Sequence, residues 1–394
     1  MSFRVVSPYR VCPLGAHIDH QGAAVLGAAI SAQSVLVAQC SDDGVVRVES
    51  ADFDGLCEFR IDDDAFVLES ALSVDSWTRY VVAAARVLRC HVGQPLRRGI
   101  VGNVRGTLPA CGVSSSASVG LAYIAAFARA NAIALTPVEL IMLDRALEND
   151  CLGLRNGILD QSSIVLGKRD CLVRIDTRTA QHELMPVAID ADPFRILLVH
   201  SGLSRALASP TSGYNNRVAE CRRAAEWLGE RAGIRPVGTN SLLLLSDIPA
   251  AVFEQFESEL LAHDPKACLR ARHFFSEVDR VRRGGVAWQA GNLVELGRLM
   301  NESCQSSISQ YECGAPQLEH LHEIITKTKG VFGSRFSGAG FGGAVIGVVD
   351  EREFDDEAAQ SIRDRYCARF PELRDKFQLH LLDIADGLRV EPAQ

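Results

Sequence analysis

The sequence predicts an α+β protein in which strands and helices are mixed along the chain. Short runs of apolar and β-branched residues dominate the first third, and longer segments with helical patterns dominate the second half. The two kinds of segment do not alternate regularly, as they would in a doubly wound sheet. With 394 residues, of which 47% are hydrophobic, the chain has the length of two or three domains and can bury a large core.

The first half supplies most of the expected strands, which are FRVVS, SVLVAQC, VVRVES, CEFRID, GIVGNVRG, CLVRID and RILLVHSG. The helices expected among them are SWTRYVVAAARVLRC, SSSASVGLAYIAAFARANA and VELIMLDRALEND. The last of these follows Pro137, and proline is favoured in the first turn of a helix.

The second half reads mainly as helices, at YNNRVAECRRAAEWLG, ACLRARHFFSEVDRVRRG, NLVELGRLMNES and EREFDDEAAQSIRDRYCARF. It contains no repeat, no low-complexity tract and no obvious linker. We place a domain boundary near residue 195, which divides the chain into residues 1–194 and 195–394.

Charge and cysteine usage exclude several classes of protein. The net charge is -8 and the pI is about 5.7, whereas nucleic-acid binders usually carry a basic excess. The 12 cysteines form no C-x-x-C pair, so a paired-cysteine zinc site is not expected. The N-terminus lacks the pattern of a signal peptide, and no apolar run approaches a membrane span. We therefore expect free thiols in the cytoplasm.

A serine-rich loop, LPACGVSSSASVG, precedes one of the expected helices. The N-terminus of a helix leaves backbone N–H groups free and carries partial positive charge. Small residues let a phosphate approach that backbone, and serine hydroxyls can reach the phosphate or its Mg²⁺. The alternative is that Ser114 only caps the helix.

A glycine-rich loop, GAGFGG, lies at residues 338–343 and matches the string G-x-G-x-x-G. A dinucleotide site needs a helix directly after the loop, but AVIGVVD follows, which is a strand by composition. We therefore predict a strand, a glycine turn and a second strand, either as a plain hairpin or as a place where backbone approaches a ligand. Neither loop is a Walker motif.

Two carboxylates lie between these loops, in ALENDCLGLRNGILDQSS. Glu148 is expected near the end of a helix, and Asp160 follows a turn that contains glycine. One carboxylate could bind Mg²⁺ through oxygen, and the other could orient or deprotonate a hydroxyl. Taken alone, both also fit surface charges or helix caps.

The segment RVCPLGAHIDHQG, residues 10–22, gathers one arginine, two histidines and one aspartate among small and apolar residues. It ends in glycine. Its polar cluster is interrupted by Ala16, and this interruption requires an explanation.

Together these stretches resemble the GHMP small-molecule kinases, in particular their galactokinase branch. RVCPLGAHIDHQG resembles the sugar-binding signature R-V-N-x-I-G-E-H-T-D-Y-x-G, GVSSSAS resembles the phosphate loop G-L-S-S-S-A-S, and SGAGFGG matches the third motif. NGILDQ resembles the segment with the catalytic aspartate, and RARHFFSEVDRV resembles a helix of the C-terminal domain. The likeness extends from about residue 4 to the end, and three motifs in order are specific as a set.

The resemblance implies the two-domain GHMP kinase fold with its active site in the cleft between domains. It implies an ATP-dependent, Mg²⁺-requiring sugar 1-kinase, and it assigns a role to each matching residue. Asp160 would accept the proton of the anomeric hydroxyl, and Arg10 would sit beside it and steady the γ-phosphate. The implied nucleotide site comprises Gly112, Ser114, Ser115, Ser116, Gly338 and Gly340; the implied metal ligands are Ser116 and Glu148; the implied sugar contacts are Ala16, His17, Asp19 and Tyr214.

Position 16 carries the argument about the substrate, because the family signature has a glutamate there that approaches the C6 hydroxyl of the sugar. A glutamate would repel a substrate with a carboxylate at C6, by about 1 kcal/mol in water and about 4 kcal/mol near a protein surface at roughly 4 Å. Alanine removes that charge and frees volume. The signature also resembles that of the plant galacturonate kinases. We therefore interpret Ala16 as a substitution that adapts the sugar site to D-galacturonic acid.

Two departures from the family concern the edges of the implied site. The first loop is one residue shorter between proline and glycine than the family's P-x-G-x-G-L, so the phosphate cradle differs in detail. The segment LASPTSGYNNR is longer before Tyr214 than in galactokinases. Arg205 and the backbone at 211–213 are therefore our candidates for binding the C6 carboxylate.

Two alternatives stay open at this point. The protein could be a galactokinase or a kinase of another related sugar, and Ala16 is the feature that discriminates against this. It could also be an inactive sugar-sensing regulator, against which the intact Arg10, Glu148 and Asp160 argue. A small-molecule sugar or sugar acid and ATP are the expected partners, without nucleic acid or membrane, and the oligomeric state is left open.

Overall fold

The structure is a computed structural model that describes residues 2–69, 72, 76–108, 112–203, 213–236 and 242–393. Its chain contacts divide it into two compact units. Unit 1 consists of Met1–Val11, Ala28–Arg169 and Ile384–Gln394, and unit 2 consists of Cys12–Gly27 and Asp170–Asp383.

These bounds differ from the single boundary near residue 195 that the sequence suggested. Two long strands are the reason, because β1 (Ser2–Leu14) ends and β2 (Val25–Ser41) begins within unit 2. The chain's end returns to unit 1, where β12 (Arg389–Pro392) pairs with β1. Nothing in the local composition marks these crossings, so periodicity could not reveal them.

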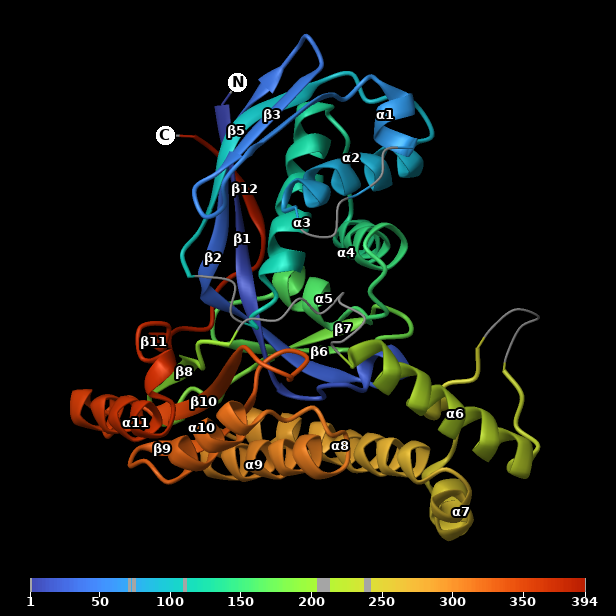
Figure 1. Ribbon diagram of the computed structural model, residues 1–394, viewed down its shortest axis with the longest axis vertical. Coiled ribbons are helices and arrows are strands. Elements are labelled where there is room, and N and C mark those ends of the chain that lie inside the picture. Colours follow the sequence, from blue (N-terminus) through green and yellow to red (C-terminus); the bar gives the residue numbers. More distant parts are fainter. Residues whose placement is uncertain are drawn as a thin grey trace. The chain divides into compact units, whose positions relative to one another are not determined.

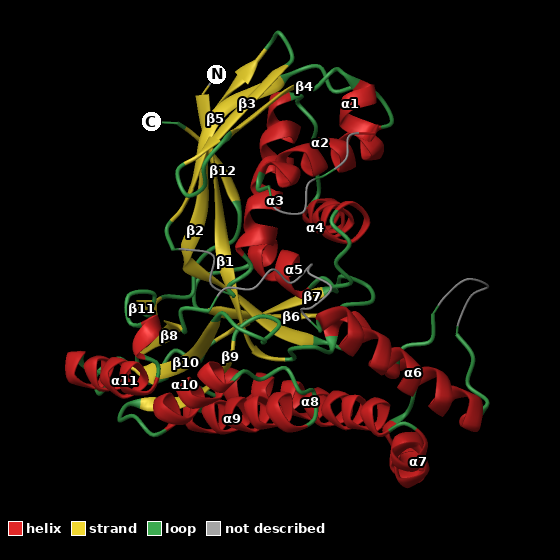
Figure 2. Cartoon of the chain, viewed as in Figure 1, coloured by secondary structure: helices red, strands yellow, loops and turns green. Residues whose placement is uncertain are grey.

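Unit 1 is built on a mainly antiparallel sheet with the strand order β12-β1-β2-β5-β3-β4. Its remaining strands are β3 (Val45–Ser50), β4 (Leu56–Arg60) and β5 (Gly99–Gly106). β5 pairs antiparallel with β2, with Val37 opposite Asn103, and parallel with β3. Figure 2 shows these strands as one twisted layer.

The helices of unit 1 lie on one face of this sheet (Figure 1). They are α1 (Asp64–Glu69), α2 (Thr78–Val92), α3 (Ser115–Ala130), α4 (Pro137–Ala146), the π-helical turn η2 (Leu147–Cys151) and α5 (Leu159–Leu166). Buried side chains of the strands and of α2 and α3 form one apolar core, in which Leu36, Val48 and Leu121 are fully buried. This core fixes the N-terminus of α3, which carries the serine-rich loop.

Unit 2 contains a four-stranded antiparallel sheet with the order β11-β8-β10-β9. Its strands are β8 (Phe194–His200), β9 (Val331–Phe336), β10 (Ala344–Asp350) and β11 (Gln378–Leu382). A separate pair, β6 (Cys171–Ile175) and β7 (His182–Pro186), joins the first residues of β2.

The helices of unit 2 include a long antiparallel pair, α8 and α9, which lie side by side (Figure 1). The full set is η1 (Asp19–Gln21), α6 (Tyr214–Ala232), η4 (Leu245–Asp247), α7 (Ala250–His263), α8 (Pro265–Gln289), α9 (Leu293–Ser309), α10 (Pro316–Thr326), α11 (Asp356–Arg369) and η5 (Pro371–Leu373). α9 packs against β9, which precedes the glycine-rich loop.

The α+β class is confirmed, and every strand and helix quoted from the sequence falls on a corresponding element. Among the described residues, none of the helices combines the length and the apolar character that crossing a membrane requires. The short elements η1, α5 and β7 were missed, and so were the helices α7 and α10.

Candidate active site

The serine-rich loop opens helix α3, as the sequence predicted. Gly112 has a φ of 78° and Ser114 a φ of 56°, so both lie in the left-handed region, and the helix starts at Ser115. Non-glycine residues adopt this conformation rarely. Residues 109–111, which complete the loop, lie outside the described residues. The geometry presents the first backbone N–H groups of a 16-residue helix, which is a favourable place for an anion.

Ser114 occupies the N-cap position of α3 but does not cap it with its side chain. Its hydroxyl donates a hydrogen bond to Oδ2 of Asp160, while Nε of Arg10 donates to Oδ1 at 2.6 Å. The guanidinium is almost fully buried, at 4% exposure, and the Asp160 side chain is 23% exposed. The plain capping interpretation of Ser114 is therefore wrong, and the predicted Arg10–Asp160 pair is present.

Strand β1 and helix α5 position this pair. The backbone N–H of Arg10 donates to the carbonyl of Val113 at 3.2 Å, which ties β1 to the serine loop. Asp160 stands in the first turn of α5. An ionised carboxylate accepts about four hydrogen bonds, so the two donors leave Asp160 with room to accept a hydrogen bond from a further hydroxyl.

Glu148 lies deeper in unit 1, at 1% exposure, within η2. Its Oε2 accepts hydrogen bonds from Asn156 Nδ2 at 2.5 Å and Gln161 Nε2 at 2.9 Å. Burial and then the negative charge of Asp160 raise the pKa of Glu148 to about 7, against the hydrogen bonds from Asn156 and Ser116. The predicted metal ligands Ser116 and Glu148 are therefore neighbours, and Glu148 interacts electrostatically with Asp160.

A third carboxylate, Asp144, is fully buried four residues before Glu148. Burial raises the pKa of Asp144 well above its usual range, and the charge of Glu148 raises it further. Gly120 makes room for it, because a Cβ there would come within 2.2 Å of Asp144 Oδ1. The α-helix changes to a π-helical turn between the two acids, a deviation often found at functional sites. Asp144 was not among the site residues predicted from the sequence.

The signature segment begins within β1 and continues after Leu14 as a loop in unit 2, where helix α8 holds its backbone. The N–H of Gly15 donates to Oε1 of Glu277 at 2.7 Å, and Nε2 of His273 bonds to the carbonyl of Ala16 at 3.1 Å. Burial lowers the pKa of His273 to about 4, so the ring is neutral and donates through Nε2. Ala16 is only 5% exposed. Its side-chain direction is fixed by a backbone that is anchored on both sides.

Glu277 is able to hold this loop because it stays ionised in the interior. Burial alone would raise its pKa, but Arg280 and Arg335 outweigh burial and lower it to about 2. Arg280 Nε donates to Oε2 of Glu277 at 2.7 Å, and Ser303 donates to Oε1 at 2.7 Å. All four groups are buried.

The predicted sugar-contacting side chains lie around Tyr311, which is fully buried at the end of α9. The ring of His17 stacks on that of Tyr311 with centroids 4.1 Å apart, and the hydroxyl of Tyr311 bonds to Nε2 of His20 at 3.1 Å. The ring of Tyr214, the first residue of α6, meets His20 edge-on at 6.4 Å. Asp19 begins η1 in the same segment.

The glycine-rich loop joins β9 to β10 as a hairpin, with Val345 opposite Phe336. The prediction of strand, turn and strand is confirmed, and so is the exclusion of a dinucleotide fold. Gly338 and Gly340 have positive φ, 69° and 75°. A Cβ on Gly340 would come within 2.5 Å of the carbonyl oxygen of Cys313, so here glycine is required by close backbone packing.

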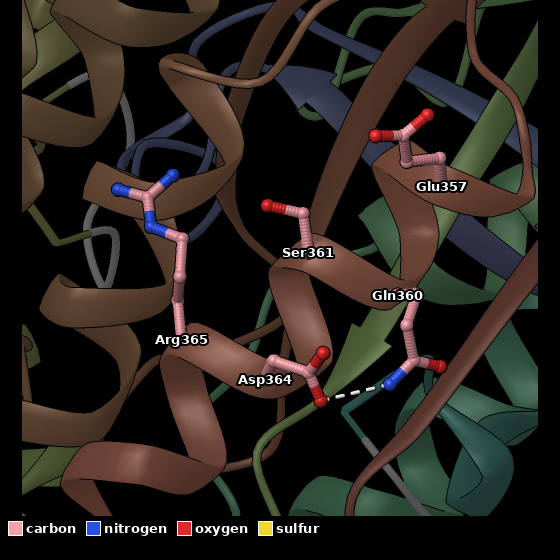
Figure 3. A pocket seen from close by; sticks show the side chains of 5 residues that line it. All are labelled: Glu357, Gln360, Ser361, Asp364 and Arg365. Atoms are coloured by element: carbon pink, nitrogen blue, oxygen red, sulfur yellow. Dashed lines mark hydrogen bonds between the residues drawn. The ribbon is translucent and has the colours of Figure 1, made fainter.

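Some candidates are not brought together by the structure. Arg205 and residues 211–212 lie outside the described residues, and only Gly213 of that segment is described, as the N-cap of α6. A shallow hollow on α11 contains no predicted site residue (Figure 3). Its lining is Glu357, Gln360, Ser361, Asp364 and Arg365, all exposed on one helix. It carries no functional argument.

Several side chains that hold predicted site residues in place were not predicted from the sequence. They are Asn156 and Gln161 beside Glu148, His273 and Glu277 behind the signature loop, and Tyr311 and Cys313 beside His17. Several were within quoted stretches, such as NGILDQ and RARHFFSEVDRV. His273 and Glu277, four residues apart on the same face of one helix, were the available signal.

Comparisons with known proteins agree with this architecture. Residues 79–168 match the GHMP kinases N terminal domain, and residues 286–372 match the GHMP kinases C terminal domain. Galacturonokinase of Arabidopsis thaliana is 42% identical over 383 residues, covering 93% of this chain and 88% of the relative. Galactokinase of Enterococcus faecalis is 30% identical, covering 92% and 91%.

Comparisons with solved structures agree with these family matches. Galactokinase of Lactococcus lactis complexed with galactose superposes with a TM-score of 0.86 at 27% identity, covering 98% of this chain and 95% of that one. A mevalonate kinase, at 15% identity and a TM-score of 0.64, shares the fold. The chain therefore belongs to the GHMP kinase family and has its two-domain fold. Within that family, its relatives are sugar kinases of the galactokinase branch.

Proposed function

We propose that this protein is an ATP-dependent sugar 1-kinase that phosphorylates the anomeric hydroxyl of D-galacturonic acid, giving galacturonic acid 1-phosphate. The observation that carries the proposal is the pairing of Asp160 with Arg10 and Ser114 in unit 1, together with alanine at position 16 in unit 2. The likeness to a galacturonokinase over nearly the whole chain supports the choice of substrate.

Asp160 is the proposed proton acceptor. Its carboxylate takes the proton of the anomeric hydroxyl as the sugar oxygen bonds to the γ-phosphorus and the bond to ADP breaks. Arg10 keeps Asp160 in place and supplies positive charge near the transferring phosphoryl group. Positioning and charge stabilisation provide most of the catalysis in this reaction class. The phosphates would lie against the loop from Gly112 to Ser116, at the start of α3.

Mg²⁺ fits the residues present. Ser116 and Glu148 offer a hydroxyl and a buried carboxylate, both oxygen donors of the kind that Mg²⁺ prefers. Among the described residues there is no group of three or more His, Cys, Asp or Glu side chains that could hold a metal without help. This suits an ion that is completed by phosphate oxygens and water. When bound, Mg²⁺ neutralises charge on the phosphates.

Unit 2 supplies the proposed sugar contacts. His17, Asp19 and Tyr214 would bond to the sugar hydroxyls, and polar groups aimed at hydroxyls discriminate strongly between sugars. The anchored backbone at Gly15 and Ala16 fixes which way residue 16 faces. An uncharged, small side chain there suits a substrate with a carboxylate at C6. Arg205 is our candidate for the positive partner of that carboxylate.

A galactokinase is the second candidate, because several relatives carry that name. Ala16 disfavours it, since the glutamate that would accept a hydrogen bond from the C6 hydroxyl is missing. An inactive regulator is disfavoured by the assembled Arg10–Asp160 pair and by Glu148.

The described cysteines are all free thiols, which supports a cytoplasmic environment.

A panel of sugars tests the proposal. ADP release would be measured with galacturonate, glucuronate, galactose and glucose, and the product would be identified by ³¹P NMR. We expect an anomeric phosphate with galacturonate and weak activity with the neutral sugars. Efficient turnover of galactose with little on galacturonate would favour the galactokinase, and no turnover of any sugar would favour the regulator.

A further inference from the structure

Residues 311–313, which form a turn directly after α9, contact two parts of unit 2 that the sequence places far apart, the sugar signature and the glycine hairpin. We call them the 311–313 turn. Its backbone is fixed to the helix end, because the N–H groups of Tyr311 and Cys313 donate to the carbonyls of Ser306 at 3.0 Å and Ser307 at 3.1 Å. Glu312 between them has a φ of 55°, in the left-handed region. The turn is therefore a rigid feature.

The turn touches the sugar signature through two side chains. The ring of Tyr311 stacks on His17 at an interplanar angle of 13°. The thiol of Cys313 lies 3.3 Å from Nε2 of His17. Cys313 is fully buried and His17 is 6% exposed, so water cannot substitute freely for this contact.

The turn also holds the glycine hairpin. The N–H of Phe341 donates to the carbonyl of Cys313 at 2.7 Å. Gly340 packs so closely on Cys313 that a Cβ there would lie 2.9 Å from the sulfur. One residue thus connects His17 of the signature with the third motif.

The hydrogen-bond geometry determines which nitrogen of His17 carries hydrogen. The thiol lies 3.5 Å from the carbonyl oxygen of Ser307, which can only accept. Burial raises the pKa of the Cys313 thiol to about 12, so the sulfur keeps its hydrogen. Both contacts of the sulfur are satisfied together only if S–H donates to Ser307 and Nε2–H of His17 donates to the sulfur.

We propose that Cys313 is a positioning residue for sugar binding, which fixes the ring of His17 in its Nε2–H form through the thiol contact. The inference rests on the proposed function, because it assumes that His17 contacts the sugar. In the Nε2–H form, Nδ1 is the ring nitrogen that accepts a hydrogen bond. A ring held in the wrong form would present a donor instead, and the sugar would bind less well.

Two substitutions of Cys313 test the proposal on the full-length protein. Cys313→Val keeps a small apolar side chain, which has one heavy atom more than that of cysteine, and removes the hydrogen bond, whereas Cys313→Ser keeps a donor and an acceptor. Cys268→Val is the matched control, since Cys268 is also buried in unit 2 but bonds to the carbonyl of Glu257. We expect Cys313→Val to raise the KM for galacturonate about tenfold and to leave the KM for ATP within twofold. Cys313→Ser should restore most of the loss, and the control should behave as wild type.

The proposal is overturned if Cys313→Val leaves the sugar KM unchanged, if it raises both KM values alike, or if serine behaves as valine does. Should Cys313→Val fail to fold in a thermal melt, ¹⁵N NMR of histidine-labelled wild type decides. A protonated Nε2 and an unprotonated Nδ1 at His17 support the proposal, and the reverse contradicts it. If the wild type does not phosphorylate galacturonate, the proposed function fails, and the NMR result still tests the thiol contact.

Discussion

The two units hold their proposed functional residues in different ways. In unit 1, the residues proposed to do chemistry bond directly to one another, as in the contacts of Asp160 with Arg10 and Ser114. In unit 2, the residues proposed to contact the sugar are held by a layer of buried side chains behind them. Glu277 and Cys313 belong to that layer.

This difference predicts different responses to substitution. A change in unit 1 removes a reacting group, so turnover should fall while substrate binding persists. A change in unit 2 alters the position or the charge of the proposed sugar-binding surface. KM and sugar preference should therefore change more than turnover.

Replacement of Asp160 by asparagine should lower kcat by about a hundredfold or more while the fold survives. Asparagine keeps the shape and can still accept the hydrogen bond from Arg10, but it cannot take a proton. The measurement is kcat with galacturonate, alongside a thermal melt. Asp54→Asn, an exposed site in unit 1, is the control. Retention of more than about a tenth of the wild-type turnover would remove Asp160 from the role of base.

Replacement of Glu148 by alanine should raise the Mg²⁺ concentration for half-maximal activity by about tenfold. The carboxylate is the charged member of the proposed ligand pair, and Ser116 alone would hold the ion weakly. The measurement is activity against free Mg²⁺ at saturating ATP and sugar. The exposed Glu49 of unit 1 provides the matched control Glu49→Ala. An unchanged Mg²⁺ requirement in the Glu148 variant would place the ion elsewhere.

The contrast between the units also explains how much was predictable from the sequence. Asp160, Glu148 and the serine loop could be found because they lie in short strings that resemble the motifs of a known family; taken alone, the two carboxylates also fitted surface charges or helix caps. The long helices and the hairpin could be found from periodicity and from the strand after the glycines. The position of Ser114 at the start of the helix was predicted, but its hydrogen bond to Asp160 was not.

The remainder could not be predicted because it depends on contacts between distant parts of the chain. Gly15 meets Glu277 across 262 residues, and His17 meets Cys313 across 296. No local pattern specifies such pairs. The unit bounds were hidden for the same reason, because β1 and β2 continue from one unit into the other without a break in their strand pattern.

The mildest perturbation is a change of pH, which should act on unit 2 through Glu277. Its pKa in the folded protein is about 2, below the ordinary 4.5. The ionised form therefore stabilises the fold fully above pH 4.5, and this stabilisation is lost as the pH falls from about 4.5 towards 2. The loss should be on the order of 3 kcal/mol in the free energy of unfolding.

Urea unfolding of the wild type and of Glu277→Gln between pH 2 and pH 5 measures this contribution. The variant should be less stable at neutral pH and should lack this part of the acid-induced loss, because glutamine does not titrate. Equal pH dependence in the two proteins would mean that other carboxylates carry the effect.

The central claim is that alanine at position 16 selects a substrate with a carboxylate at C6. The direct measurement is the ratio of kcat/KM for galacturonate to kcat/KM for galactose, in the wild type, in Ala16→Glu and in Ala16→Gln. Glutamine has the size of glutamate without its charge, so it separates repulsion from lost volume. We predict that the wild type strongly prefers galacturonate. Ala16→Glu should lower kcat/KM for galacturonate about ten- to a thousandfold, as expected for like charges roughly 4 Å apart. The same variant should lose less kcat/KM for galactose. Ala16→Gln should lower kcat/KM for galacturonate less than Ala16→Glu does. A wild type that prefers galactose, or an Ala16→Glu variant that loses activity equally on both sugars, would contradict the account.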